Sequence, residues 1–138
     1  MIRAVIDTNV LVSALISPFG NEARVLDALQ RNLITPYFSR SILDEYAGVL
    51  SRPKFGFSSE KIQGLIGLIE AKGRIFEPVP MPGASPDSGD DDFIACAFAA
   101  QAEYIVTGNK RHFPAESCGQ TKVISARELI EALSGTHS

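Results

Sequence analysis

The sequence predicts an α/β fold with a mainly parallel central sheet. Short segments rich in β-branched residues alternate with longer amphipathic segments along the chain, and this alternation is typical of units that pair their strands in parallel. The chain has 138 residues, of which 45% are hydrophobic, and this is enough to bury one ordinary core. We therefore expect residues 1–138 to form a single domain.

The N-terminal segment predicts one strand followed by two helices. Residues 2–6 (IRAVI) are short and β-branched, and the residues after them place apolar side chains at helical spacing. A second helix is expected from about residue 21 to residue 32, where apolar residues again repeat every three or four positions. The segment LITPYF at 33–38 then predicts the next strand.

Two serines offer start signals for the helix after this strand. Ser39 or Ser41 can cap it, and Ser41 stands three residues before Asp44, which is the spacing of a capping box. The helix should end near Ser51, because Pro53 disfavours a helical conformation in the residue before it.

The second half of the chain repeats the alternation around one long loop. An amphipathic helix at 58–73 should close at Gly73. The loop at 77–92 has the composition of a linker, but the remaining sequence is too short for a core of its own, so a functional loop inside one domain is the better interpretation. The other predicted elements are strands at 74–79, 103–108 and 122–124 and helices at about 90–102 and 126–133.

The composition narrows the possible function classes. A formal net charge of -3 gives no field that attracts nucleic acid to the whole protein, so a polyanion would need a local basic patch or bound cations. Cys96 and Cys118 lack the spacing of a metal site or a disulfide framework, which suits a reducing compartment. No apolar run approaches the roughly 20 residues of a membrane span. We expect a cytoplasmic protein without membrane contact.

Polar residues follow strands at the edge where open α/β sheets bind ligands. Asp7 interrupts the apolar stretch VIDTNVLV at the end of the first strand, and Asn109 comes just after a later strand. Glu45 should point inward, because it lies within the apolar stripe of Ile42 and Tyr46 on its helix. An inward glutamate can also pair with an arginine or cap a backbone group, and that alternative stays open.

The stretch DSGDDDFIACAFAA contains four aspartates before a helix. Most acidic runs at this position compensate the helix dipole or form solvated surface. Helical phase singles out Asp91, which precedes Ile94 by three residues in a stripe that continues to Phe98. The residues on either side are rotated away by about 100°. Asp91 is therefore the first candidate and Asp90 the second.

Asp7, Glu45 and Asp91 are thus expected at one end of the sheet. Two carboxylates about 4 Å apart repel by about 4 kcal/mol at an effective dielectric constant near 20, so a cation, protons or separation must resolve the repulsion. Because no cysteine or histidine is expected to converge with them, oxygen ligation favours Mg²⁺ or Mn²⁺ over zinc. The sequence predicts these three residues as metal ligands.

These segments resemble the PIN-domain nucleases. The resemblance rests on three motifs in order: IDTNVLVSAL, SILDEYAGVLSRPKF and PDSGDDDFIACAFAAQAEYIVTGNKRHF. The chain is most similar to bacterial and archaeal members classed as toxins of toxin–antitoxin pairs. The resemblance implies a three-layer α/β/α sandwich and a Mg²⁺- or Mn²⁺-dependent endoribonuclease with Asp7, Glu45 and Asp91 as its acids. It also implies an RNA substrate, an antitoxin protein and a homodimer.

The chain departs from the family pattern at Asn109. An aspartate is usual there, two residues after the threonine that Thr107 matches. Asparagine keeps a carbonyl oxygen but removes one negative charge, so a second metal ion should bind more weakly. Asn109 is a candidate catalytic residue, and it also supports an alternative, a decayed PIN domain that binds RNA or a partner protein without cleavage.

In the mechanistic hypothesis Asp7 and Asp91 hold the ion, while Glu45 is a ligand or orients the attacking water. In-line attack on the phosphodiester would leave a 5′-phosphate and a 3′-hydroxyl. Phosphatases with an aspartate nucleophile fit less well, because Asn9 stands where they carry a second aspartate. Phosphoreceiver domains fit less well too, because their paired acids at the first strand are missing.

Basic and aromatic residues have two interpretations each. The basic candidates for phosphate contacts, which are equally well explained as ordinary surface, are Arg52, Lys54, Lys110 and Arg111. Phe55 and Phe57 can stack on bases, although burial in the core is the preferred interpretation. No chemistry is assigned to His112 or His137.

Overall fold

A five-stranded, fully parallel sheet forms the centre of the computed structural model, which describes residues 1–135. The strand order is β3-β2-β1-β4-β5. The strands are β1 (Ile2–Ile6), β2 (Ile34–Phe38), β3 (Arg74–Ile75), β4 (Tyr104–Val106) and β5 (Lys122–Ile124). The helices are α1 (Thr8–Ile16), α2 (Asn21–Gln30), α3 (Arg40–Leu50), α4 (Ser59–Lys72), α5 (Asp91–Ala100), α6 (Ala115–Cys118) and α7 (Ala126–Gly135), with the 3₁₀ turns η1 (Pro53–Phe55), η2 (Ser88–Asp90) and η3 (Lys110–His112).

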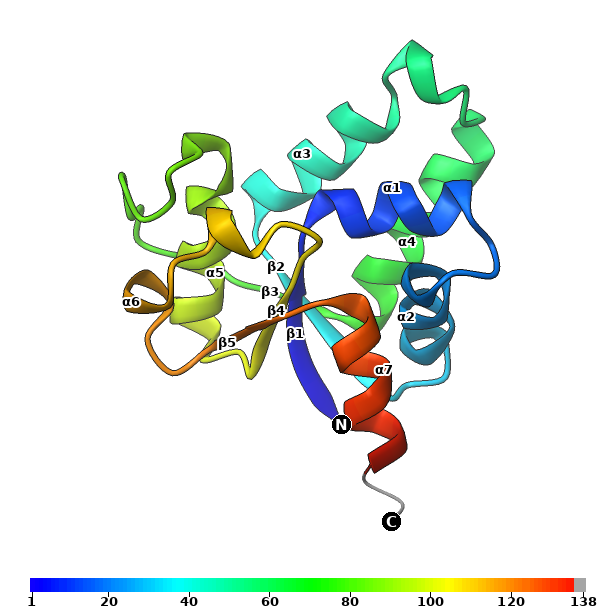
Figure 1. Cartoon of the computed structure of the whole chain (residues 1–138). Coiled ribbons are helices and arrows are strands. Elements are labelled where there is room, and N and C mark those ends of the chain that lie inside the picture. The colour runs from blue at the N-terminus through cyan, green and yellow to red at the C-terminus, as the bar shows by residue number, and fades with distance from the viewer. Residues whose placement is uncertain (136–138) are drawn as a thin grey trace.

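Helices cover both faces of the sheet, which makes three layers (Figure 1). On one face α5 contacts β1, β2 and β4, and α6 contacts α5. On the other face α2 and α4 contact β2, while α1 and α7 pack against α2. A parallel sheet needs this double cover because its strands are apolar on both sides. The predicted α/β/α sandwich with a mainly parallel sheet is therefore confirmed.

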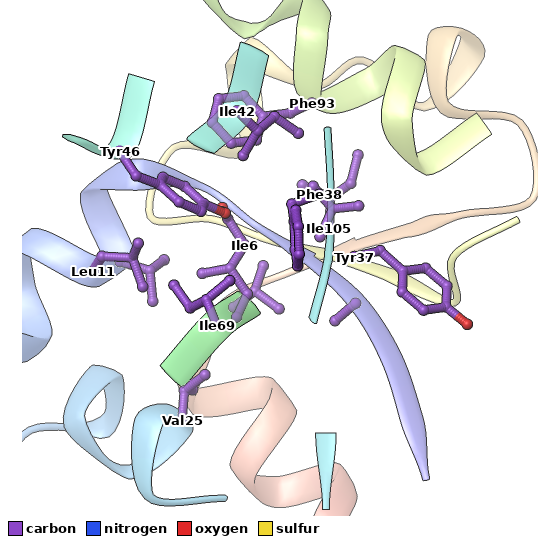
Figure 2. Close-up of a cluster of buried hydrophobic side chains, with 14 of the residues drawn as sticks. Ile6, Leu11, Val25, Tyr37, Phe38, Ile42, Tyr46, Ile69, Phe93 and Ile105 are labelled. Atoms are coloured by element: carbon purple, nitrogen blue, oxygen red, sulfur yellow. The ribbon is translucent and has the colours of Figure 1, made fainter. Parts of the chain in front are cut away.

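The core lies on both sides of the sheet and reaches up to the carboxyl end of β1. Figure 2 shows Tyr46 from α3 leaning over Ile6 of β1, and the Tyr46 hydroxyl donates a hydrogen bond to the Ile6 carbonyl at 2.5 Å. The Tyr46 ring also lies 6.3 Å from the ring of Phe93 on α5. Buried apolar side chains thus form the floor directly beneath Asp7, the next residue after β1.

The strand register places the carboxyl ends of β1 and β4 side by side at one edge of the sheet. Ile6 of β1 pairs with Val106 of β4. The pairing continues one residue further, because the Asp7 amide donates to the Val106 carbonyl at 2.9 Å. Asp7 and Thr107 are therefore neighbours at the same edge of the sheet, although 100 residues separate them in the sequence.

The start of α3 differs in detail from the prediction. Ser39 is the N-cap, and its hydroxyl accepts a hydrogen bond from the Ile42 amide at 3.3 Å. The predicted capping box of Ser41 and Asp44 is wrong, because α3 begins two residues earlier than that box requires. Asp44 instead pairs with Arg40 on the exposed face of the helix at 3.7 Å. The predicted end near Ser51 is confirmed.

The connection from α4 to β3 depends on Gly73. The residue ends α4 as expected, but its backbone is extended (φ -110°, ψ -167°) rather than left-handed. Glycine is required at this position by close packing, since a Cβ atom would approach the Pro36 carbonyl oxygen to 2.1 Å. β3 itself covers two residues, fewer than the six expected. Within residues 1–135, no helix combines the length and the apolar character needed to cross a membrane.

Replacing Gly73 by alanine should destabilise the fold, because backbone on both sides must move to admit the new methyl group. Overpacking of this kind costs about 1–3 kcal/mol of unfolding free energy. Gly67, inside α4, has no atom within 4 Å of the place that a Cβ would take, and Gly67→Ala should raise stability by about 0.5–1 kcal/mol through helix propensity. Urea denaturation of both variants checks the pair, and equal effects would contradict the close approach.

Candidate metal centre

Asp7 stands at the N-terminus of α1, immediately after the central strand β1, and only 3% of its surface is exposed. The Thr107 hydroxyl donates a hydrogen bond to Asp7 Oδ2 at 2.7 Å. Burial raises the pKa of the Asp7 carboxyl, whereas Thr107 and the backbone amides of Asn9 and Thr8 oppose that rise. The buried position predicted for Asp7 at the end of the first strand is the observed one.

Glu45 reaches the same place from α3. Its side chain is half-buried, and its Oε2 atom accepts a hydrogen bond from the Thr8 hydroxyl. Burial raises the pKa of the Glu45 carboxyl, and the negative charges of Asp90, Asp7 and Asp92 raise it further. The inward orientation that helical phase predicts for Glu45 therefore places it within the electrostatic reach of Asp7.

Asp90 joins these two acids from η2. Its side chain is 13% exposed, and burial is the main cause that raises the pKa of its carboxyl, followed by the charge of Asp7. A hydrogen bond from His112 lowers the pKa in opposition. Asp7, Glu45 and Asp90 thus come from three elements and repel one another at the carboxyl end of the sheet. We call these three residues the acid cluster.

His112 lies beside the acid cluster on η3. Its Nδ1 atom is 2.7 Å from Asp90 Oδ2 and 3.8 Å from Asp87 Oδ2. Its Nε2 atom lies 3.1 Å from Asn109 Nδ2. Asp87, Asp90 and His112 each offer a ligand atom, and those atoms lie within 4.8 Å of one another, so this group can hold a metal ion.

Asp91 has different partners from those expected. Its two carboxylate oxygens accept hydrogen bonds from the backbone amides of Gly83 at 3.1 Å and Ser85 at 2.7 Å. Asp91 therefore orders the loop in front of α5. These bonds leave lone pairs on both oxygens, and ligation by Asp91 stays a prediction.

The buried face of α5 differs from the predicted one at Phe98. The prediction counted Phe98 as core, but its side chain is 67% exposed. The buried face is centred on Phe93 and Ala97 instead, and a period of 3.6 residues extends that face back to Asp90 rather than Asp91. The 3₁₀ turn at the start of the helix also changes the angle between successive residues.

The donor set fits a hard divalent cation. Asp87, Asp90 and His112, whose ligand atoms lie within 4.8 Å of one another, supply carboxylate oxygens, which Mg²⁺ and Mn²⁺ prefer, and one imidazole, which Mn²⁺ also accepts. Among residues 1–135, no lysine or arginine forms an ion pair with a member of the acid cluster. Burial is the main cause of the raised pKa values of these acids, His112 opposes the rise for Asp7 and Asp90, and a bound cation would oppose it further.

Sequence reasoning missed part of this site. It assigned no chemistry to His112 and did not consider Asp87. A signal was present in the spacing, because Asn109 and His112, like Asp87 and Asp90, stand three residues apart, and a 3₁₀ turn places such residues on one side. His137 lies outside the described residues.

The basic and aromatic candidates lie outside the acid cluster. Lys110 pairs with Glu128 at 2.5 Å, and Arg52, Lys54 and Arg111 are exposed. Phe55 and Phe57 stack with ring centroids 5.5 Å apart and pack partly buried against the core. Core packing, the preferred interpretation of the two rings, is thus observed for part of their surface.

Comparisons with known proteins find a family model and a curated relative that match this chain. A family model described as PIN domain matches residues 3–111. An uncharacterized protein of Methanocaldococcus jannaschii is 33% identical over 112 residues, which cover 79% of this chain and 72% of the relative.

Two solved structures share the fold. One is the structure of VapBC2 from Rickettsia felis bound to a DNA fragment from the VapBC2 promoter. It matches with a TM-score of 0.61 and 17% identity, and the match covers 90% of this chain and 98% of that one. PAE2754 from Pyrobaculum aerophilum matches with a TM-score of 0.61 and 10% identity over 97% of this chain and 90% of that one. At these identities the likeness concerns the fold alone.

Replacing Asp7 by asparagine should stabilise the metal-free protein at neutral pH. A carboxyl with a raised folded-state pKa contributes stability that is present at low pH and is lost as the pH rises through that pKa. The variant has no such proton to lose, and its amide oxygen can still accept from Thr107. In chelator at pH 7 we expect its Tm to exceed that of wild type by about 2–8 °C, the shift that ~1 kcal/mol produces.

Thermal unfolding between about pH 4 and pH 8 measures this gap, which should close toward the acid end of the range. Asp44→Asn is the matched control, since Asp44 lies on the exposed face of α3 with its side chain 70% exposed, and its Tm should stay near that of wild type. A lower Tm for Asp7→Asn than for wild type at pH 7 would show that the buried charge does not strain the fold.

Proposed function

The chain belongs to the PIN domain family, and from that premise we propose that it is a Mg²⁺- or Mn²⁺-dependent endoribonuclease. PIN domains are typically nucleases. The single observation that carries the proposal is the acid cluster, in which Asp7, Glu45 and Asp90 have raised pKa values and no described lysine or arginine forms an ion pair with them. Three such carboxylates at a sheet edge are the oxygen donors that a hard divalent ion requires.

Each acid has a role that follows from its support. Asp7 is the most firmly placed ligand, because burial and the Thr107 hydroxyl hold it in one position. Glu45, held by Thr8, is a ligand or the base that orients the attacking water, and its raised pKa favours proton uptake. A bound divalent ion supplies Lewis-acid polarisation of the scissile phosphate and acidifies water. In-line attack leaves a 5′-phosphate and a 3′-hydroxyl.

The third ligand can come from either of two adjacent aspartates. The family resemblance assigns this role to Asp91, three residues before the pair Ile94 and Ala95. The contacts favour Asp90, because its charge acts on Asp7 and Glu45, whereas Asp91 binds the amides of Gly83 and Ser85. We propose Asp90 as the ligand and Asp91 as the residue that orders the loop, and separate substitutions distinguish the two.

RNA is the proposed substrate despite the net charge of -3. A divalent ion in the acid cluster would offset most of the negative charge and could bind a phosphate oxygen directly. Arg52, Lys54 and Arg111 are exposed and can contact the backbone on either side of the cleaved bond.

A toxin role is a further part of the proposal. The fold match to VapBC2 of Rickettsia felis supports it together with the sequence motifs. In that role an antitoxin protein would cover the acid cluster and present an arginine to the carboxylates in place of the ion. We also propose that the protein acts in the cytoplasm as a homodimer formed from single-domain chains. Its two buried, unpaired cysteines suit a reducing compartment.

A decayed PIN domain that binds RNA or a partner without cleavage is the second candidate. Asn109 favours it, because a family aspartate is missing there. The retained acids argue against it, since three mutually repelling carboxylates without an ion would only destabilise the fold.

Substitution of the acids should separate these alternatives. With Mn²⁺ we expect Asp7→Asn and Asp90→Asn to lower the rate of RNA cleavage at least about 100-fold, because the electrostatic stabilisation is worth several kcal/mol. Asp91→Asn should cost less, and Asp44→Asn should leave the rate unchanged. Labelled RNA and single-stranded DNA incubated with Mg²⁺, Mn²⁺ or chelator give the measurement.

Cleavage that persists in chelator or in Asp7→Asn would overturn the proposed mechanism. A larger loss for Asp91→Asn than for Asp90→Asn would return the third ligand to Asp91. Mn²⁺ binding without any cleavage would support the decayed domain.

Restoring an acid at position 109 should tighten metal binding. Asn109→Asp adds one negative charge beside the proposed centre, and we expect the Kd for Mn²⁺ to fall about tenfold, the effect of one charge at a few ångströms in a partly solvated site. Calorimetry on the purified protein measures the change. An unchanged Kd would mean that position 109 does not face the ion.

A further inference from the structure

We infer that His112 is a positioning residue that fixes the orientation of the Asn109 carboxamide, so that its oxygen and not its NH₂ group is offered to the metal centre. The inference rests on the proposed function for the identity of the centre. It assigns to His112 a task that neither the family match nor the acid cluster requires. The geometry that carries it is the placement of the imidazole between Asp90 and Asn109.

The positions of the protons follow from the chemistry of the partners. Asp90 Oδ2 is a carboxylate oxygen and accepts, so the one proton of the neutral His112 imidazole lies on Nδ1, 2.7 Å away. The bare Nε2 atom can then only accept, and the carboxamide atom 3.1 Å from it is Nδ2, the donor of that group. Asp87 Oδ2 is the other acid that faces Nδ1, at 3.8 Å, and it favours the same tautomer.

This tautomer selects one of two orientations of the amide. The oxygen and nitrogen of an asparagine side chain have nearly the same shape, and rotation by 180° exchanges them. The contact with His112 holds Nδ2, and within residues 1–135 no donor is hydrogen-bonded to Asn109 Oδ1. The carbonyl oxygen is therefore left as the acceptor for a cation. An aspartate would need no such selection, because its two oxygens are equivalent.

A chain of hydrogen bonds connects Asn109 to Asp7 through the backbone amide of Asn109. The Asn109 backbone amide donates to Thr107 Oγ1 at 3.0 Å, and Thr107 in turn donates to Asp7 Oδ2. The chain thus runs from Asp7 through Thr107 and Asn109 to His112 and ends at Asp90. Donation runs outward from Asn109 in both directions, through Thr107 to Asp7 and through His112 to Asp90.

The imidazole is itself held in place. The Ser85 hydroxyl donates to the His112 carbonyl at 2.5 Å, and the next residue, Phe113, is 2% exposed. The Phe113 ring packs edge-on against Phe93 of α5 with centroids 6.4 Å apart. His112 therefore cannot move away from Asn109 without disturbing the loop or the core.

A double-mutant cycle tests the inference with Mn²⁺ binding, measured by calorimetry, as the readout. His112→Ala should weaken binding about 10–100-fold, the usual cost of losing a partner that orients a ligand. In the Asn109→Asp background the same substitution should change the Kd by about twofold or less, as for uncoupled sites. His112→Gln, which keeps an acceptor and a donor, should recover part of the affinity, and Asp44→Asn on the exposed face of α3 serves as the control.

Equal losses from His112→Ala in both backgrounds would overturn the inference, because His112 would then act on the ion without the amide. No loss in the Asn109 background would overturn it as well.

The tautomer of His112 supplies a second test, which is made on the wild-type protein and so does not depend on the folding of a variant. In metal-free wild type labelled with ¹⁵N-histidine, the nitrogen shifts of His112, assigned from their absence in His112→Gln, should show a proton on Nδ1 and a bare Nε2. A proton on Nε2 would overturn the inference. A wild-type protein that binds no Mn²⁺ would instead remove the proposed metal centre, while the tautomer still decides whether His112 orients Asn109.

Discussion

Burial of a charged carboxyl at the end of the central strand is the constraint on which the rest of this structure depends. Asp7 directly follows Ile6, which has no exposed surface, and the Tyr46 hydroxyl is hydrogen-bonded to the Ile6 carbonyl. The same apolar floor that stabilises the sheet raises the pKa of this carboxyl. Ionisation of Asp7 therefore carries a desolvation cost at the position that the proposed metal centre would use.

The polar residues around Asp7 limit this cost without removing it. Hydroxyl groups of Thr8 and Thr107 are small donors that satisfy carboxylate oxygens and carry no charge. Lysine or arginine in their place would neutralise the acids and occupy the position of a cation. The hydrogen-bond network is thus suited to hold negative charge in fixed positions while leaving it uncompensated, which is the condition for strong and selective binding of a divalent ion.

Sequence patterns predict most of the fold and part of the site, and the division has a physical basis. Alternating strands and helices give the layers and the parallel sheet, because long-range burial obeys simple periodicity. The residue that caps a helix and the face of a helix that is buried depend instead on tertiary contacts. Ser39 rather than a later serine caps α3, and an exposed Phe98 misplaces the phase of α5 and so favours Asp91 over Asp90. The role of His112 depends on a 3₁₀ turn that leaves no mark in hydrophobic spacing.

The distance along the chain between Asp7 and Thr107 affects how the protein folds during its synthesis. The two residues are 100 positions apart, and β1 gains its second neighbour, β4, only when that distant segment has been made. Contacts between residues this far apart in the sequence form late and slowly, because the entropy cost of closing the loop comes before the contacts stabilise the chain. A nascent chain therefore carries the first acid early but cannot assemble the centre until translation has passed η3. Any hydrolytic capacity of the domain is therefore withheld until the segment that ends with η3 has been made.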